Sequence, residues 1–146
     1  MNFKKFGILL FFTFLFPLGI SLIVGNDARM LIKPALYPPN ILFPIVWSIL
    51  YVLMTTGVYL ASKEDDNVYI IYFLQVVVNA FWTLIFFGLK LRLLAFIWLI
   101  FLLVLVVIMS LKFYKNNKIA GYLQIPYIIW ILFAGYLNLS IYLLNR

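Results

Sequence analysis

The segment Leu93–Leu111, LLAFIWLIFLLVLVVIMSL, runs for 19 residues without a charge. An α-helix of about 20 apolar residues crosses the roughly 30 Å hydrocarbon core of a bilayer. Four further uncharged runs are Phe6–Asn26, Pro34–Ser62, Asn67–Leu89 and Ile119–Asn145. Each run is apolar on nearly every face and lacks the alternation of a transmembrane β-strand, so each predicts a helix.

The composition agrees with a membrane protein. Of the 146 residues, 67% are hydrophobic and 10% are charged, whereas soluble domains average about 45–50% apolar and about 25% charged residues. A water-soluble fold is therefore excluded. The sequence predicts an all-α, integral membrane, five-helix transmembrane bundle, as a single domain over residues 1–146. The expected helices cover residues 6–24, 41–61, 68–88, 93–111 and 119–144. Three of the four connections are short, so successive helices should be antiparallel neighbours.

The connection between the first two helices, residues 25–40, is longer than the others. Pro34, Pro38 and Pro39 prevent a helix from continuing through it. Loops of this length often cover or bind a ligand, so this one is a candidate lid. The alternative is a solvated spacer.

The first hydrophobic run follows Lys4 and Lys5, an arrangement that also occurs in signal peptides. Its apolar stretch is longer than a signal core and no small-residue cleavage site follows, so we expect a retained helix. The basic residues divide six to five between the two ends of the predicted bundle, and the positive-inside rule therefore sets no orientation. Small size and the absence of a targeting extension favour a bacterial cell membrane over a mitochondrial outer membrane.

Charge and residue types exclude several functions. The net charge of +7 comes from basic residues in the gaps between hydrophobic runs, where they would meet lipid headgroups rather than nucleic acid. The chain has no Cys and no His, which excludes disulfides, thiolate nucleophiles, His–Cys metal sites and imidazole bases. All four acidic residues lie in predicted loops. We therefore expect no metal, no cofactor and no catalytic carboxylate pair.

Three of the expected helices carry stripes of aromatic, amide and small side chains at helical spacing. The stripes are Trp47, Tyr51 and Thr55; Gln75, Asn79, Trp82 and Phe86; and Tyr127, Trp130, Phe133, Ala134 and Asn138. Polar side chains are costly in hydrocarbon and usually pair with one another or line a cavity. Helix packing explains any one of these residues. Together the stripes predict an intramembrane pocket for a flat aromatic guest.

Four motifs follow one another along the chain at fixed places in the expected helices. They are Lys33-Pro34 with Pro38-Pro39; Pro44-Ile-Val-Trp47-Ser-Ile-Leu-Tyr51; Gln75-x3-Asn79-x2-Trp82-x3-Phe86-Phe87; and Pro126-Tyr127-x2-Trp130-x2-Phe133-Ala134-x2-Leu137-Asn138. In this order and spacing, residues 30–146 resemble the TspO/MBR family of translocator proteins, also called tryptophan-rich sensory proteins or peripheral-type benzodiazepine receptors.

The resemblance implies a five-helix bundle, often a homodimer, with a pocket in each protomer under the first long loop. It also implies binding of porphyrins such as protoporphyrin IX, or of sterols in some lineages. The pocket positions that it implies are Pro38, Trp47, Asn79, Phe86, Trp130 and Ala134. The implied sterol motif is Leu139, Tyr142 and Arg146.

The chain departs from the family pattern in its long loop. Leu36 stands where the family usually has Trp, and Asp27 and Ala28 stand where it often has aromatic residues. Without a His or Cys axial ligand, a metal-free porphyrin is a better guest than haem. Arg29 or Lys33 would pair with a porphyrin propionate.

The leading expectation is a membrane protein that binds, and transports or senses, a tetrapyrrole or a related lipophilic ligand. One alternative is a light-dependent porphyrin-degrading enzyme that uses Trp47 and Trp130. Another is a structural membrane subunit in which the polar stripes only pack helices. Membrane lipid and a second copy of the chain are the other expected partners.

Overall fold

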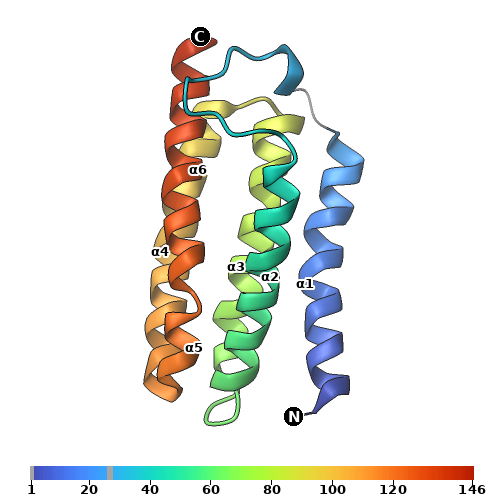
Figure 1. Ribbon diagram of the computed structural model, residues 1–146, viewed down its shortest axis with the longest axis vertical. Helices are drawn as coiled ribbons and strands as arrows, with labels where there is room; N and C mark the ends of the chain where they lie inside the picture. The colour runs from blue at the N-terminus through green and yellow to red at the C-terminus, as the bar shows by residue number, and fades with distance from the viewer. Residues whose placement is uncertain (1, 26–27) are drawn as a thin grey trace.

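The computed structural model describes residues 2–25 and 28–146, which form an elongated helical bundle (Figure 1). The helices are α1 (Phe3–Val24), α2 (Leu42–Ala61), α3 (Val68–Thr83), α4 (Arg92–Asn116), α5 (Lys118–Tyr122) and α6 (Ile125–Leu144). A 3-10 turn, η1 (Ala28–Met30), lies in the loop after α1, and a π-helical turn, η2 (Leu84–Gly88), continues α3.

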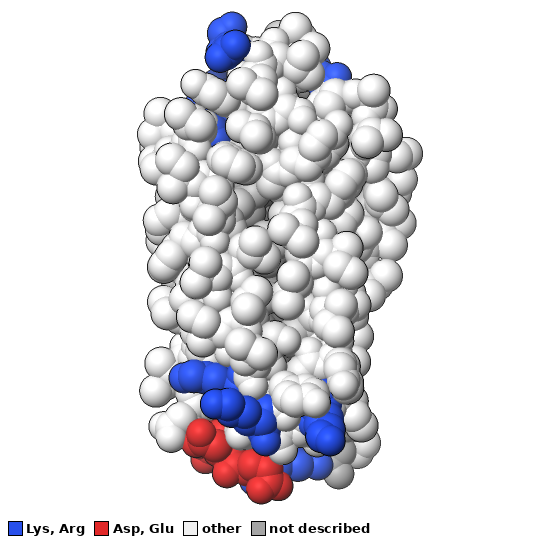
Figure 2. Space-filling view, turned by 90° about the vertical axis from the view of Figure 1, so that its left-hand side faces the viewer, with Lys and Arg blue, Asp and Glu red and all other residues white. Residues whose placement is uncertain are grey.

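Five helical segments of the described chain are long and apolar enough to cross a membrane, with α3 and η2 forming one segment and α5 and α6 another. The charged side chains gather at the two ends of the bundle, and the belt between them is uncharged on the face that Figure 2 shows. The chain is thus a multi-pass integral membrane protein, which confirms the predicted fold class. Its exposed apolar side chains face lipid.

Two predicted helix boundaries differ from the structure by more than one residue. Helix α1 begins at Phe3 rather than at residue 6, because the Asn2 side chain accepts a hydrogen bond from the backbone N–H of Lys5 and caps the helix. Helix α4 continues to Asn116 rather than ending at residue 111. Its last turns carry Lys112 and Lys115, whose long side chains can keep their ammonium groups at the aqueous interface.

The last span, predicted as one helix over residues 119–144, consists of two helices. Helix α5 ends at Tyr122 and α6 begins at Ile125. Pro126 lies in the first turn of α6, where its missing N–H disrupts no helical hydrogen bond. The chain therefore breaks just before Pro126, whereas α1 runs through Pro17 without a break.

Buried polar side chains pair across the helices in the bundle interior. Tyr72 of α3 hydrogen-bonds Thr13 of α1, and the Thr55 hydroxyl of α2 lies 3.4 Å from each of their hydroxyls. The Tyr127 hydroxyl of α6 donates to Gln75 Oε1 at 2.8 Å. Hydrocarbon offers these groups no other partner, so the pairs hold the helices together. Gln75 is therefore a packing residue.

Gly121 allows α5 to lie directly against α4. A Cβ at this position would lie 2.5 Å from the Tyr114 Cβ and 2.8 Å from the Tyr114 Cα. The nearest obstacles include backbone atoms, which cannot rotate away. The two helices could accept a methyl group only by moving apart.

We expect Gly121→Ala to lower the free energy of unfolding by about 1–3 kcal/mol, as overpacking does elsewhere. Thermal unfolding in detergent, followed by circular dichroism, measures this effect. Gly7→Ala in α1 is the control, because no atom lies within 4 Å of a Cβ there. The control should be neutral or stabilising by up to about 1 kcal/mol. Equal melting temperatures for the two variants would contradict the close α4–α5 contact.

Candidate ligand-binding site

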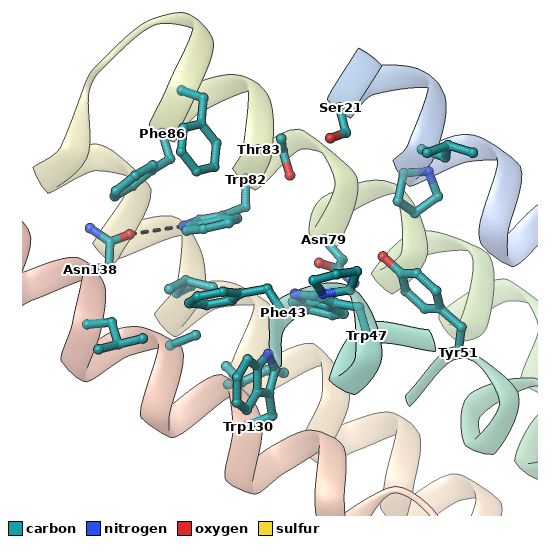
Figure 3. Close-up of a pocket in the computed structure, with 18 of the residues that line it drawn as sticks. Ser21, Phe43, Trp47, Tyr51, Asn79, Trp82, Thr83, Phe86, Trp130 and Asn138 are labelled. Carbon is teal, nitrogen blue, oxygen red and sulfur yellow. Dashed lines mark hydrogen bonds between the residues drawn. The ribbon is translucent and has the colours of Figure 1, made fainter. Parts of the chain in front are cut away.

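A cavity of about 420 Å³ lies in the half of the bundle that carries the loop between α1 and α2 (Figure 3). Helices α1, α2, α3 and α6, together with η2 and the loop, supply most of its walls. Ligand pockets in proteins span about 300–1,000 Å³. Among the described residues, no side chain that lines the cavity is charged, and most of these side chains are aromatic or aliphatic.

Eight of the predicted ligand-binding residues line this cavity. They are Trp47, Tyr51, Asn79, Trp82, Phe86, Trp130, Ala134 and Asn138. Pro38 and Tyr127 do not line it. Tyr127 is only 1% exposed, and its ring packs edge-on against Trp47 with 6.2 Å between centroids. It therefore supports the Trp47 wall from behind, while Pro38 lies beside Tyr37, which does line the cavity.

Several lining residues were missed by the sequence reasoning. Helix α1 contributes Phe14, Pro17, Leu18 and Ser21, and the loop with the start of α2 contributes Tyr37, Asn40, Phe43, Pro44 and Ser48. The signal on α1 was weak: Thr13, Pro17 and Ser21 share one face at four-residue spacing, but no amide or indole accompanies them. The other missed residues, Thr83, Phe87, Leu99, Ile131, Leu137 and Ile141, neighbour the predicted stripes or are purely aliphatic.

The π-helical turn η2 shapes one end of the cavity. The backbone N–H of Leu89 donates to the Leu84 carbonyl at 2.9 Å. This bond joins residues five apart, whereas the bonds of an α-helix join residues four apart. This wider turn changes the angular spacing of its side chains, and both Phe86 and Phe87 line the cavity. Phe86 stacks on Trp82 at 5.1 Å between centroids.

Asn138 fixes the orientation of the Trp82 indole. The Trp82 Nε1–H donates to Asn138 Oδ1 at 3.0 Å, and Asn138 Nδ2 donates to the Arg92 carbonyl at 2.7 Å. The carboxamide thus ties α6 to α3 and to the start of α4. Both the oxygen and the nitrogen of the Asn138 carboxamide already form hydrogen bonds within the protein, so Asn138 acts as a positioning residue for Trp82.

Two other polar groups at the cavity have no hydrogen-bond partner within the described residues. The Trp130 Nε1–H is buried and unsatisfied. The Asn79 side chain is 5% exposed and lines the cavity, and the described part of the chain supplies no hydrogen bond to its carboxamide. Leaving the buried Trp130 donor unsatisfied costs about 1–3 kcal/mol. Both groups are therefore available to a guest.

The family model of the TspO/MBR family matches residues 8–144. The chain belongs to the TspO/MBR family. The protein named Tryptophan-rich protein TspO from Chlorobaculum tepidum is 36% identical over 121 residues, which cover 79% of this chain and 77% of that protein. The Tryptophan-rich sensory protein of Cereibacter sphaeroides is 30% identical over 144 residues, or 93% and 91% of the two chains. The Translocator protein homolog of Schizosaccharomyces pombe is 32% identical over 145 residues, or 90% and 88%.

The sterol motif that the TspO/MBR resemblance implies lies outside the cavity. Leu139 and Tyr142 are half-buried near the end of α6, and Arg146 is exposed beyond it. None of the three lines the cavity. If the motif binds a sterol, it does so at a separate surface.

The loop between α1 and α2 is attached to the end of α6 by a reciprocal pair of hydrogen bonds. The Ile32 N–H donates to Asn145 Oδ1 at 2.8 Å, and Asn145 Nδ2 donates to the Ile32 carbonyl at 2.9 Å. Residues 26–27 of the candidate lid lie outside the described residues. The later part of the loop closes one end of the cavity with Tyr37 and Asn40.

The cations proposed as propionate partners lie near this closure without lining the cavity. The Lys33 ammonium lies 4.6 Å from the centroid of the Tyr37 ring, and Arg29 is exposed in η1. Burial raises the pKa of the Tyr37 phenol above its ordinary value, so this hydroxyl stays neutral at physiological pH. Of these two cations, Lys33 is the one positioned against a lining residue; the Arg92 guanidinium also lies against one, 5.3 Å from the centroid of the Phe86 ring.

We expect Asn145→Ala to release the loop, because the variant loses both bonds to Ile32. Each bond is worth about 0.5–1.5 kcal/mol, so the open population should rise roughly tenfold. Trypsin cleavage after the exposed Arg29 measures this population. Asn116→Ala is the control, since Asn116 donates to the Ala61 carbonyl at the opposite end of the bundle. Cleavage at the same rate in wild type and both variants would show that Asn145 does not restrain the loop.

Proposed function

We propose that this TspO/MBR protein binds a planar, largely aromatic molecule in the cavity, with metal-free protoporphyrin IX as the leading ligand. The observation that carries the proposal is an uncharged, aromatic-walled cavity of about 420 Å³ inside a membrane bundle. A carrier or sensor of lipophilic molecules needs such a site. A purely structural subunit gains nothing from leaving space in its core, because voids cost stability.

The aromatic walls suit a flat guest. Trp82 and Phe86 stack with 27° between their planes, and Trp130 lies 5.9 Å from Phe43, centroid to centroid. Aromatic faces and edges attract a polycyclic ring system in offset or edge-on geometry. The rings come from α2, α3, η2 and α6, so the guest would contact four elements at once.

The polar groups support an acceptor-bearing guest. The Trp130 N–H would donate to a ligand oxygen or nitrogen, and the Asn79 carboxamide would donate and accept. Porphyrin propionates are negatively charged and cannot remain among uncharged walls without a partner. Lys33, held over Tyr37, is the cation that would receive one at the loop end. The absence of His and Cys from the chain favours the metal-free ring over haem.

We place the protein in a bacterial cell membrane, a proposal supported by the relatives from Chlorobaculum tepidum and Cereibacter sphaeroides. Separating the inner membrane from other fractions of the source cells tests it.

Titration of the purified protein with protoporphyrin IX should quench tryptophan fluorescence saturably. Trp47→Phe and Trp130→Phe should each weaken binding about tenfold, because each loses ring area, and Trp130→Phe also loses a donor. Trp98→Phe is the matched control, since Trp98 bonds the Val78 carbonyl and lies outside the cavity lining. Absence of saturation, or equal weakening in all three variants, would favour the structural-subunit alternative.

Illumination of the same complex tests the enzymatic alternative. If the protein only binds the ligand, the porphyrin absorbance should decay no faster with wild type than with Trp47→Phe at equal occupancy. Faster decay that depends on Trp47 or Trp130 would instead support light-dependent porphyrin degradation.

A further inference from the structure

A second hollow lies between α1 and α3, toward the end of these helices opposite the cavity. It is an open groove of about 390 Å³. Its lining residues are Asn2, Lys4, Lys5, Ile8, Leu9, Tyr69 and Phe73. The groove and the cavity share no lining residue, so a guest in the groove is independent of the ligand proposed for the cavity.

The chemistry of the groove changes along α1. Lys4 and Lys5 are exposed at the end of the bundle where the chain begins. Ile8 lies one helical turn closer to the membrane centre and is 49% exposed, and Phe73 on the facing helix is 43% exposed. A cationic mouth thus leads into an apolar channel that opens toward lipid.

The mouth of the groove is held in place by several contacts. The Lys5 ammonium lies 5.1 Å from the centroid of the Tyr69 ring. The Tyr69 hydroxyl donates to Ser62 Oγ at 2.9 Å, and its ring stacks on Phe73 at 6.2 Å. The backbone N–H of Asn2 donates to the Tyr59 hydroxyl at 2.6 Å. These contacts orient the α3 wall and one lysine before any guest arrives.

The charge at this end of the bundle favours an anion. The end carries Lys4, Lys5, Lys63, Lys112, Lys115 and Lys118 against Glu64, Asp65 and Asp66. Neither Lys4 nor Lys5 forms an ion pair with a carboxylate of the described residues. Asp66 is the acidic residue whose charge acts on Lys5. Two cations therefore face the groove with one carboxylate near them.

We propose that this groove binds an anionic phospholipid. Its phosphate lies between the ammonium groups of Lys4 and Lys5, and one acyl chain runs beside Ile8, Leu9 and Phe73 along the α1–α3 groove. A zwitterionic lipid should bind more weakly, because its own headgroup cation competes with the two lysines for the phosphate. A soluble anion would leave the apolar part of the groove empty.

Ile8→Trp places a fluorescent reporter in the groove, and Leu111→Trp places a matched one on the lipid-facing surface of α4, beside Lys112 at the same end. Leu111 is 59% exposed and lies outside the groove. Both variants are reconstituted in vesicles of phosphatidylcholine with a tenth of either brominated phosphatidylglycerol or brominated phosphatidylcholine. The added tryptophan signal, relative to wild type, reports which lipid occupies each position.

At Ile8→Trp we expect a preference for phosphatidylglycerol of roughly tenfold, from two lysines at the membrane surface. Adding Lys4→Gln and Lys5→Gln should abolish the preference, and adding Asp66→Asn should increase it. Lys112→Gln with Lys115→Gln should leave it unchanged. If Ile8→Trp does not fold, Phe73→Trp reports from the opposite wall.

Equal preferences at Ile8→Trp and Leu111→Trp would mean that the basic end attracts anionic lipid generally, and would overturn a specific site. A preference at Ile8→Trp that survives the loss of Lys4 and Lys5 would overturn it as well.

Discussion

A bilayer interior supplies no hydrogen-bond partner, and this shortage determines how the bundle is arranged. Backbone groups are satisfied within helices, and buried polar side chains must find one another. Tyr72 meets Thr13, and Tyr127 meets Gln75. Each pair joins two helices that are distant in sequence. Polar pairing therefore provides specific links between helices that apolar contact alone does not supply in lipid.

The lack of hydrogen-bond partners in the bilayer also distinguishes the cavity from the rest of the bundle interior. Trp82, placed by Asn138, is satisfied within the protein, and so is Trp98 on the Val78 carbonyl. The Trp130 N–H, buried at the cavity, is not satisfied within the described residues. In a membrane an unpaired donor lowers the stability of the empty protein, and it can form a hydrogen bond once a ligand with an acceptor fills the cavity. The unsatisfied groups lie where the aromatic walls leave room, and this coincidence is the basis for a binding function.

The sequence was sufficient to predict the membrane-spanning segments, because uncharged apolar runs long enough to cross a bilayer are rare outside transmembrane helices. It also identified eight of the 23 residues that line the cavity, since amides and indoles at helical spacing mark an inward face. It failed for Leu18 and its neighbours in α1, where Thr13 and Ser21 are the two hydroxyl side chains and no amide or indole marks the inward face. It failed for Phe87 because the extra residue of the π turn depends on packing. The separation of α5 from α6 was signalled only by Pro126.

The central claim is that three of the four indoles surround one enterable space, and indole ¹H–¹⁵N NMR tests it most directly. The protein in detergent should give one Nε1–H signal for each tryptophan. Adding metal-free protoporphyrin IX should shift the signals of Trp47, Trp82 and Trp130, and Trp130 should move furthest as its N–H gains an acceptor. The Trp98 signal should stay in place. Shifts confined to Trp98, or no shifts at saturating ligand, would contradict the claim.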